Sequence, residues 1–284
     1  MGVAGRTVLI TGCSSGIGRA TALRLARSGR SVYATARDPN SIASLEGPNC
    51  RTLRLDVTDP DSIGEAVAAV EEESGPVGAL INNAGYSQSG AVEDVPMHLV
   101  RRQFETNVFG PLGLIQAVLP GMRRAGRGKI VNMSSMGGKL TFPGGGLYHA
   151  SKHAIEALSD ALRFEVRGFG VDVIVVEPGI ITTEFGSTAA SSVPAGTGSD
   201  GPYDAFNSAV AVGTQMAYEK GALRRLGGGP DVVARVIERA LEAKHPRARY
   251  PVTPSARLLM TARKVMPDNA WDALLKRQFP QPRP

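Results

Sequence analysis

The chain has 284 residues, of which 42% are hydrophobic and 20% are charged. This length is sufficient to bury the core of one large α/β domain, and two full domains are not expected. The formal net charge is +6, but the lysines and arginines are scattered without an aromatic-interleaved basic stripe, which argues against a nucleic-acid partner. Two cysteines, Cys13 and Cys50, are too few for a disulfide framework, so we expect inert packing residues in a reduced, cytoplasmic protein.

No segment has the pattern of a targeting or membrane-spanning element. The N-terminal residues MGVAGRTVLITG pass directly into a short apolar segment, without a basic stretch followed by a long hydrophobic one. A membrane-spanning helix needs about 18 to 20 consecutive apolar residues, and no window offers them. The sequence therefore predicts neither a signal peptide nor a transmembrane helix.

Short segments rich in β-branched residues alternate with longer amphipathic segments through the first two thirds of the chain. Most of the short segments are apolar without strict alternation, which is typical of parallel strands covered on both faces. The expected strands are Thr7–Ile10, Ser31–Ala36, Arg51–Val57, Ala79–Asn82, Lys129–Met133 and Val171–Pro178. The expected helices are Ile17–Ser28, Asp61–Glu73, Met97–Arg124 and Tyr148–Arg167. This order predicts an α/β fold with a Rossmann-type doubly wound parallel sheet, helices on both faces, and a single domain over residues 1–284.

The alternation ends after Pro178. Residues Ser187–Gly201, STAASSVPAGTGSDG, are rich in Ser, Ala, Gly and Pro and are expected to form a loop, followed by a helical segment that closes at Gly227–Pro230. A helix at Asp231–Ala243 and a short strand near Arg249–Val252 are expected to complete the sheet.

Two segments outside this pattern are expected to shape a substrate site. Residues 184–229 combine aromatic and apolar side chains with Gly and Ser, which favours a lid across the cleft; a disordered insertion is the alternative. Residues 255–279 mix basic residues with Leu, Met, Trp and Phe, and Pro267 divides them. We expect this helical extension to cap the pocket or a subunit interface, with membrane-surface contact as the less favoured alternative.

A glycine-rich segment, TGCSSGIG at Thr11–Gly18, follows the first expected strand. Gly12, Gly16 and Gly18 fall where the strand turns into a helix, so backbone N–H groups and the positive end of the helix dipole can bind a pyrophosphate. Glycine is common in ordinary tight turns, but the strand before this segment and the helix after it favour a dinucleotide site.

Six motifs occur in one order along the chain. They are TGxxxGIG at Thr11–Gly18, NNAG at Asn82–Gly85, Asn107 in TNVFG, the pair Ser134–Ser135, YxxxK at Tyr148–Lys152 and PG at Pro178–Gly179. Together they resemble the short-chain dehydrogenase/reductase family, and within it the branch that contains 17β-hydroxysteroid and retinol dehydrogenases. The resemblance implies an oxidoreductase that uses a nicotinamide cofactor.

The resemblance also assigns cofactor contacts, most of them at the ends of strands. Asp56 and Val57 would flank the adenine, and Ile181 and Thr183 would hold the nicotinamide carboxamide. The full implied set is Gly12, Ser14, Ser15, Gly16, Ile17, Gly18, Arg37, Asp56, Val57, Asn83, Ala84, Gly85, Tyr148, Lys152, Pro178, Gly179, Ile181 and Thr183.

The catalytic set implied by the resemblance is Asn107, Ser135, Tyr148 and Lys152. The family has a serine thirteen residues before the tyrosine, which selects Ser135 rather than Ser134. Tyr148 and Lys152 are spaced i, i+4 and share one helix face, so the ammonium, with help from the positive nicotinamide, is expected to lower the pKa of the phenol and favour proton transfer. Ser135 would hydrogen-bond the substrate oxygen, and Asn107 would sit at a helix irregularity and hold a water that joins Lys152 to solvent.

Other polar residues near these motifs are expected to have structural roles. His149 and His153 are also spaced i, i+4, but two further ligands at zinc spacing are absent, so no metal site is predicted. Both histidines are assigned to the helix surface or to an interface. Glu93 and Asp94 are expected to be a solvated loop pair.

The choice of cofactor rests on YATARDP, Tyr33–Pro39, at the end of the second strand. NAD-specific members of the family carry Asp where this chain has Ala36, and Arg37 follows immediately. A guanidinium can pair with a 2′-phosphate, and Ser14 is a second candidate ligand, so NADP(H) is expected. If Arg37 points into the site, the side chain of Asp38 should point away.

The leading hypothesis is an NADP(H)-dependent oxidoreductase that acts on an apolar alcohol or ketone, such as a steroid-type or retinoid-type compound. The alternatives are a 3-oxoacyl-thioester reductase and a catalytically silent, cofactor-binding regulatory protein. The family habit of pairing helices between subunits implies a homodimer or homotetramer.

Overall fold

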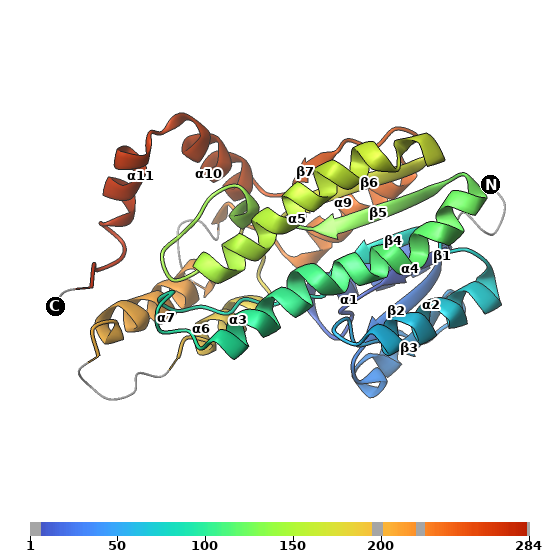
Figure 1. Cartoon of the computed structure of the whole chain (residues 1–284), viewed down its shortest axis with the longest axis horizontal. Coiled ribbons are helices and arrows are strands. Elements are labelled where there is room, and N and C mark those ends of the chain that lie inside the picture. Colours follow the sequence, from blue (N-terminus) through green and yellow to red (C-terminus); the bar gives the residue numbers. More distant parts are fainter. Residues whose placement is uncertain (1–6, 195–200, 220–224, 283–284) are drawn as a thin grey trace.

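The computed structural model describes residues 7–194, 201–219 and 225–282. Within these residues, one sheet holds seven parallel strands in the order β3-β2-β1-β4-β5-β6-β7. The strands are β1 (Thr7–Ile10), β2 (Ser31–Ala36), β3 (Cys50–Arg54), β4 (Ala79–Asn82), β5 (Gly128–Met133), β6 (Val171–Glu177) and β7 (Arg249–Pro251). The predicted doubly wound parallel sheet in a single domain is confirmed (Figure 1).

Helices cover both faces of the sheet, and each face has its own hydrophobic core. On one face, Leu25 of α1 and Ile237 of α9 pack with strand residues such as Ile10. On the other face, Val67 of α2 and Leu114 of α4 pack around Leu80. The α-helices of this layered part are α1 (Gly16–Arg27), α2 (Pro60–Ser74), α3 (Met97–Phe104), α4 (Gly110–Ala125), α5 (Gly146–Glu165) and α9 (Pro230–Glu242), and a short 3-10 helix at Pro39–Leu45 joins β2 to β3.

Local capping chemistry sets several of these helix boundaries. The side chain of Asp59 accepts a hydrogen bond from the backbone N–H of Asp61 at 3.0 Å, and Pro60 occupies the first turn of α2. At the other end of a helix, Gly126 adopts a left-handed φ of 63° and terminates α4. These residues thus mark where the chain leaves the sheet before α2 and where it returns to the sheet after α4.

Both cysteines are free and buried in the core shared by α1 and α9. Burial raises the pKa of the Cys13 thiol to about 12 and that of Cys50 to about 11. Such thiols are largely protonated and unreactive at neutral pH, in agreement with their predicted role as packing residues.

Three predicted elements differ from the structure. The helix predicted at Met97–Arg124 is divided by one π-helical turn at Glu105–Phe109, between α3 and α4. The strand predicted at Arg51–Val57 ends at Arg54, because Asp56 turns to accept hydrogen bonds from Thr58. The predicted loop from Ser187 is helical up to Ser191, in α6 (Phe185–Ser191), and residues 195–200 of it lie outside the described residues.

The segments outside the α/β alternation gather beyond the carboxyl ends of the strands (Figure 1). They comprise α6, α7 (Asp204–Glu219), α10 (Pro254–Val265) and α11 (Asp268–Leu275). The predicted division of the C-terminal extension at Pro267 is observed, since Pro267 separates α10 from α11. In the described part of the chain, no helix is both long and apolar enough to cross a membrane.

Candidate active site

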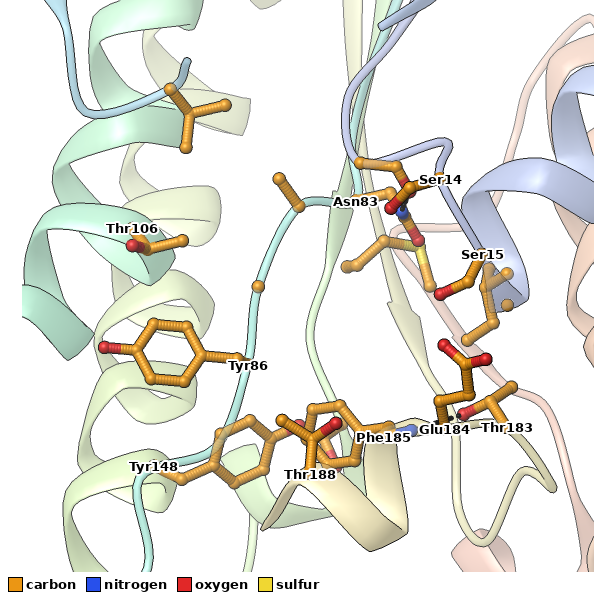
Figure 2. A pocket seen from close by; sticks show the side chains of 18 of the residues that line it. Ser14, Ser15, Asn83, Tyr86, Thr106, Tyr148, Thr183, Glu184, Phe185 and Thr188 are labelled. Carbon is orange, nitrogen blue, oxygen red and sulfur yellow. Dashed lines mark hydrogen bonds between the residues drawn. The ribbon is translucent and has the colours of Figure 1, made fainter. Parts of the chain in front are cut away.

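A cavity of about 660 Å³ opens at the carboxyl ends of the strands, beside the point where strand order reverses between β1 and β4. Ser135 and all of the predicted cofactor residues except Gly18 line it. Figure 2 shows Ser14, Ser15 and Asn83 on one side, Tyr86 and Thr106 on the opposite side, and Tyr148 with Thr188 at the lower edge. Asn107 lies behind the wall and does not line the cavity.

The glycine loop after β1 is fixed against the segment after β4. The hydroxyl oxygen of Thr11 accepts hydrogen bonds from the backbone N–H groups of Asn83 and Ala84, both at 3.0 Å. Asn83 Nδ2 donates to the carbonyl oxygens of Thr11 and Gly12 at 2.9 and 3.0 Å. Gly12 has a φ of 70°, and a Cβ there would lie 2.8 Å from Ala84 Cα. A Cβ on Gly18 would overlap the Gly12 carbonyl oxygen, so Gly18 supports the loop from below rather than lining the cavity.

The start of α1 has the donors that a pyrophosphate requires. Ser15 is the N-cap residue, yet its side chain makes no capping hydrogen bond, and the first turn of α1 contains no acidic residue. The hydroxyls of Ser14 and Ser15 therefore face the cavity together with the N-terminal backbone N–H groups of the helix (Figure 2). These donors fit an anionic dinucleotide.

The end of β2 presents Arg37 to the cavity and turns Asp38 away from it. Asp38 Oδ1 accepts a hydrogen bond from the backbone N–H of Asn40 at 3.0 Å and caps the short helix Pro39–Leu45. Arg37 lines the cavity close to Asp56. Burial acts to raise the pKa of Asp56, but hydrogen bonds from Thr58 and the charge of Arg37 hold it below the usual value. The expected arrangement of Arg37 and Asp38 is observed.

Tyr148, Ser135 and Lys152 converge on one wall. A hydrogen bond joins the Tyr148 phenol to Ser135, whose Oγ also accepts from the backbone N–H of Gly137 at 3.1 Å. Lys152 Nζ lies 5.7 Å from the Tyr148 ring centroid and donates to the carbonyl oxygen of Met133 at 2.8 Å. All three residues thus line the same wall of the cavity.

Burial shifts the pKa values of both Tyr148 and Lys152. Burial raises the pKa of Tyr148 to about 12, and the hydrogen bond from Ser135 only partly offsets this. Burial also lowers the pKa of Lys152 to about 8, while the charge of Glu156 acts in the opposite direction. In the protein without cofactor, burial therefore keeps the Tyr148 phenol protonated, and the lowering of its pKa expected from Lys152 together with the positive nicotinamide stays a prediction.

Asn107 lies in the π-helical turn between α3 and α4, at the helix irregularity that was expected. Its Oδ1 accepts from the backbone N–H of Tyr86 at 3.1 Å, and its Nδ2 donates to the carbonyl oxygen of Tyr86 at 2.9 Å and to Ser151 Oγ at 3.1 Å. The side chain therefore joins three segments: the π turn, the residues after β4, and α5.

One histidine was placed wrongly. His149 is only 8% exposed, and its ring packs against Gly137 and Gly145 with Nδ1 3.2 Å from the Gly137 carbonyl oxygen. Burial lowers the pKa of His149 to about 4, so the ring is neutral at pH 7. His153 is exposed, as expected. Among residues 7–194, 201–219 and 225–282, no cluster of side chains could hold a metal ion.

Comparison with known proteins decides the family. The model of the family described as short chain dehydrogenase matches residues 6–193, which is more than half of the chain. The chain belongs to the short-chain dehydrogenase family. Its relatives include an NADPH-dependent 3-dehydrocapnine reductase of Ornithobacterium rhinotracheale, 33% identical over 95% of each chain. Human retinol dehydrogenase 5 is 35% identical over 97% of this chain and 89% of its own. A short-chain dehydrogenase structure from Streptomyces avermitilis has a TM-score of 0.79 at 34% identity and covers 96% of both chains.

Several cavity-lining residues of this dehydrogenase were not predicted. They are Tyr86, Gln88, Arg102, Thr106, Glu184 and Thr188, among others. Tyr86 directly follows NNAG and Thr106 directly precedes Asn107, so adjacency to a motif could have indicated both. Glu184 carries a carboxylate on the same side of the cavity as Ser15 (Figure 2), and no motif indicates it.

The segment beyond β6 brings aromatic side chains to Tyr148. The ring centroids of Tyr148 and Phe185 are 5.4 Å apart, and those of Phe185 and Tyr218 are 6.3 Å apart. The segment is held to the residues after NNAG by side chains: Asn207 Nδ2 donates to Asp94 at 2.8 Å, and Tyr203 donates to Glu93 at 2.6 Å. The expectation that Glu93 and Asp94 are only a solvated pair is therefore wrong, because both accept hydrogen bonds from α7 or the residues just before it.

Proposed function

We propose that this oxidoreductase transfers hydride between NADP(H) and an apolar alcohol or ketone, with Ser135, Tyr148, Lys152 and Asn107 as the catalytic set. One observation carries the proposal. The hydroxyls of Ser135 and Tyr148 and the ammonium of Lys152 line the same cavity as a glycine loop with uncommitted Ser15 and an inward-facing Arg37. A protein that only bound the cofactor would have no chemical need for these two hydroxyls and this ammonium group together.

In the proposed reaction, Tyr148 transfers the proton, and Ser135 and Lys152 stabilise the charges that develop. The bound nicotinamide would supply or accept the hydride. In the direction of reduction, Tyr148 gives its proton to the carbonyl oxygen, and Ser135 hydrogen-bonds that oxygen as it gains charge. Because burial raises the pKa of Tyr148, the phenol is held in its proton-donating form, and Lys152 stabilises the phenolate left after transfer. Asn107 holds the π turn where a water would link Lys152 to solvent.

The preference for NADP(H) is supported by the charge at the end of β2. Ala36 leaves no carboxylate to repel a 2′-phosphate, Asp38 is engaged in capping, and Arg37 faces the cavity. A relative that is 33% identical is named as NADPH-dependent, which agrees with this assignment. Ser14 is the second proposed phosphate ligand.

An apolar substrate is supported by the aromatic surface beside Tyr148. Phe185 and Tyr218 line the cavity beside Tyr148, and on this basis we assign the described residues of 184–229 to a substrate lid; residues 195–200 and 220–224 of that range lie outside the described residues. The names of the two relatives above, a 3-dehydrocapnine reductase and a retinol dehydrogenase, are consistent with a carbonyl or hydroxyl group on a larger apolar molecule.

We also propose that the enzyme is a homo-oligomer that pairs through the face of α4 and α5. Large apolar side chains are exposed on α5 and next to both helices: Phe164 of α5 is 86% exposed, Phe109 in the π turn before α4 is 52% exposed, and Phe169 in the short helix after α5 is 47% exposed. Such a concentration of exposed aromatic surface is typical of a subunit interface. Size-exclusion chromatography with light scattering should give a dimer or tetramer, and Phe164→Glu should dissociate it. A wild-type monomer at micromolar concentration would contradict the assignment.

The proposed activity is tested by following NADPH absorbance with a panel of ketones that range from short and polar to long and apolar. Oxidation of NADPH should be fastest with apolar ketones and slower when NADH replaces NADPH. The panel should include a 3-oxoacyl thioester. Faster turnover of that thioester than of any free ketone would contradict the proposed substrate class.

A further inference from the structure

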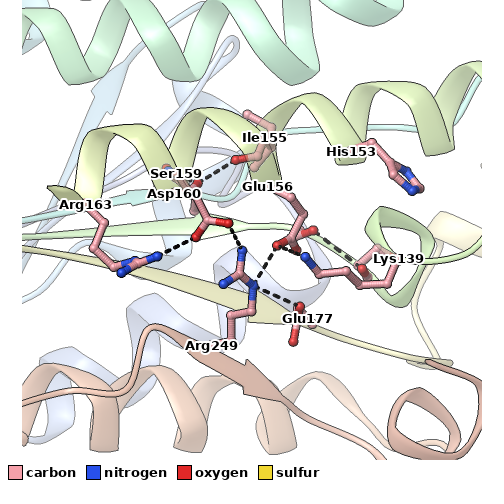
Figure 3. A network of polar contacts seen from close by, with 12 residues as sticks. Lys139, His153, Ile155, Glu156, Ser159, Asp160, Arg163, Glu177 and Arg249 are labelled. Atoms are coloured by element: carbon pink, nitrogen blue, oxygen red, sulfur yellow. Dashed lines mark hydrogen bonds and ion pairs between the residues drawn. The ribbon is translucent and has the colours of Figure 1, made fainter. Parts of the chain in front are cut away.

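Five charged side chains form a cluster directly behind the active site. Glu156 Oε2 accepts from Lys139 Nζ at 2.8 Å and from Arg249 Nε at 3.0 Å (Figure 3). Arg249 also donates to Asp160 at 2.6 Å and lies 3.6 Å from a carboxylate oxygen of Glu177. Glu156 and Glu177 are the two most deeply buried of these five residues, with exposed fractions of 4% and 2%. We call these five residues the acid cluster.

Three segments that carry active-site residues each contribute a member of the acid cluster. Lys139 follows the short helix Met136–Gly138, which begins immediately after Ser135. Glu156 lies four residues after Lys152 on α5, and therefore on the same face of that helix. Glu177 is the last residue of β6 and immediately precedes the Pro178–Gly179 motif. The cluster is thus positioned to influence the site through α5 and through both flanking segments.

The two buried glutamates have different surroundings. Glu156 has direct contacts with both cations, whereas Glu177 has only the longer contact with Arg249. Burial, followed by the negative charge of Glu156, raises the pKa of Glu177 to about 7. Near neutral pH, Glu177 is therefore the member that takes up a proton, and Glu156 is the carboxylate that the two cations hold in place.

We propose that Glu156 is a positioning residue that acts through Lys152, keeping the buried ammonium charged by placing a carboxylate one helical turn away. This role rests on the proposed function of Lys152. Lys152 is 6% exposed and donates to the Met133 carbonyl oxygen, a neutral group that cannot compensate a full charge. Burial lowers the pKa of Lys152 to about 8, and Glu156 opposes this shift.

The direction of the effect follows from the charges that face each group. Around Glu156 these are Lys139 after the Ser135 turn, Arg249 from β7, Glu177 from β6 and Asp160 from α5. Around Lys152 they are Glu156 and the Tyr148 phenol, both from α5. Removing the charge of Glu156 should lower the pKa of Lys152 further, so that the lysine loses its proton at a lower pH.

The central test compares Glu156→Gln with two matched variants of the acid cluster, Glu177→Gln and Asp160→Asn. NADPH binding is measured by fluorescence across pH 6 to 10, and turnover of an apolar ketone is measured over the same range. For Glu156→Gln, the decline at high pH should begin about one pH unit lower than in the wild type. Glutamine resembles the protonated form of Glu177, so Glu177→Gln should remove the change in the profile near pH 7 and should shift the decline at high pH less than Glu156→Gln does. Asp160→Asn should keep the wild-type position of the decline, because Asp160 is exposed and lies two helical turns from Lys152.

Two further variants keep the test decisive if Glu156→Gln folds poorly. Glu156→Asp should restore the wild-type position of the decline, because it keeps the carboxylate. Lys139→Met removes a cation from Glu156 without touching Lys152 and should shift the decline to higher pH. Equal shifts in Glu156→Gln and Asp160→Asn, or no shift in Glu156→Gln, would overturn the proposal. A wild type that binds NADPH but turns over no ketone would count against the proposed function, while the binding profile would still decide the role of Glu156.

Discussion

The parts of the molecule before and after Pro178 are held together by different kinds of contact. Before it, the side chains of Thr11 and Asn83 bond the glycine loop and the NNAG segment to each other through backbone groups, and the two segments lie so close that a Cβ at Gly12 or Gly18 would overlap its neighbours. After it, α7 of the proposed lid is attached through its side chains, as where Asn207 accepts a hydrogen bond from the backbone N–H of Ala91 at 2.9 Å. A rigid backbone suits a cofactor of constant shape, whereas side-chain contacts can be changed to suit a new substrate without disturbing the sheet. Changes in the glycine loop and the NNAG segment should therefore alter cofactor binding, and changes in α7 and in the helices after β7 should alter substrate binding.

Among the variants that test this comparison, Gly18→Ala is expected to cause the largest change in stability and in NADPH affinity. The added methyl group would overlap the Gly12 carbonyl oxygen and Asn83 Nδ2, so the loop must move. We expect a loss of about 1–3 kcal/mol in the free energy of unfolding, typical of overpacking, and NADPH affinity reduced by more than about tenfold. Gly64→Ala is the matched control, because a Cβ at Gly64 meets nothing within 4 Å. Denaturant unfolding would measure the stability of both variants, and NADPH titration would measure their affinity. Unchanged NADPH affinity in Gly18→Ala would contradict this description of the glycine loop.

Trp271→Ala tests the part of the molecule after Pro178, and it should weaken substrate binding without changing cofactor binding. Trp271 of α11 is 3% exposed, packs on Phe142 with ring centroids 6.0 Å apart, and donates to the Thr141 carbonyl oxygen at 3.4 Å. Phe142 in turn contacts His149, the neighbour of Tyr148. Replacement of a buried tryptophan by alanine lowers the free energy of unfolding by about 3–5 kcal/mol. In this protein it should also loosen the segment between Ser135 and Tyr148.

The expected readout of Trp271→Ala is a KM for the apolar ketone raised about tenfold, or about 1.4 kcal/mol, with the Kd of NADPH unchanged. Leu258→Ala, at a 55% exposed position of α10, is the control and should change neither value. Because Trp271 is the one tryptophan in the sequence, its fluorescence in the wild type should also respond to substrate. Equal weakening of NADPH and substrate binding would contradict the division between the two parts.

Arg37→Ala should have a smaller effect, confined to one phosphate group. We expect NADPH binding to weaken about tenfold, or about 1.4 kcal/mol, while NADH binding is nearly unchanged. The preference for NADPH should fade at high salt, because Arg37 is near the surface. Arg51→Ala, which removes an exposed arginine paired with Glu73 at 2.8 Å, is the control. Equal losses for NADPH and NADH would show that Arg37 has a structural role.

The sequence predicted the layered part of the fold and most of the residues that line the cavity because those features depend on local signals. Strand composition, the glycine spacing and the i, i+4 pair Tyr148 and Lys152 are all visible within short windows. The burial of His149 was not predictable in this way, because it depends on Gly137 and Gly145 leaving space for the ring. The helix at Phe185–Ser191 was also missed, since Ser, Ala and Gly favour a loop unless tertiary contacts at Phe185 and Ala189 stabilise a helix.

The most direct test of the account is the comparison of cofactor binding and turnover in Tyr148→Phe. Phenylalanine keeps the ring against Phe185 but removes the proton that would pass to the substrate oxygen. We predict that NADPH affinity stays within about twofold of the wild type while turnover of an apolar ketone falls by about 10²–10⁴-fold, the usual contribution of a positioned general acid. Turnover of Tyr148→Phe close to that of the wild type, with the ketone and NADPH both bound, would contradict the central role given to Tyr148.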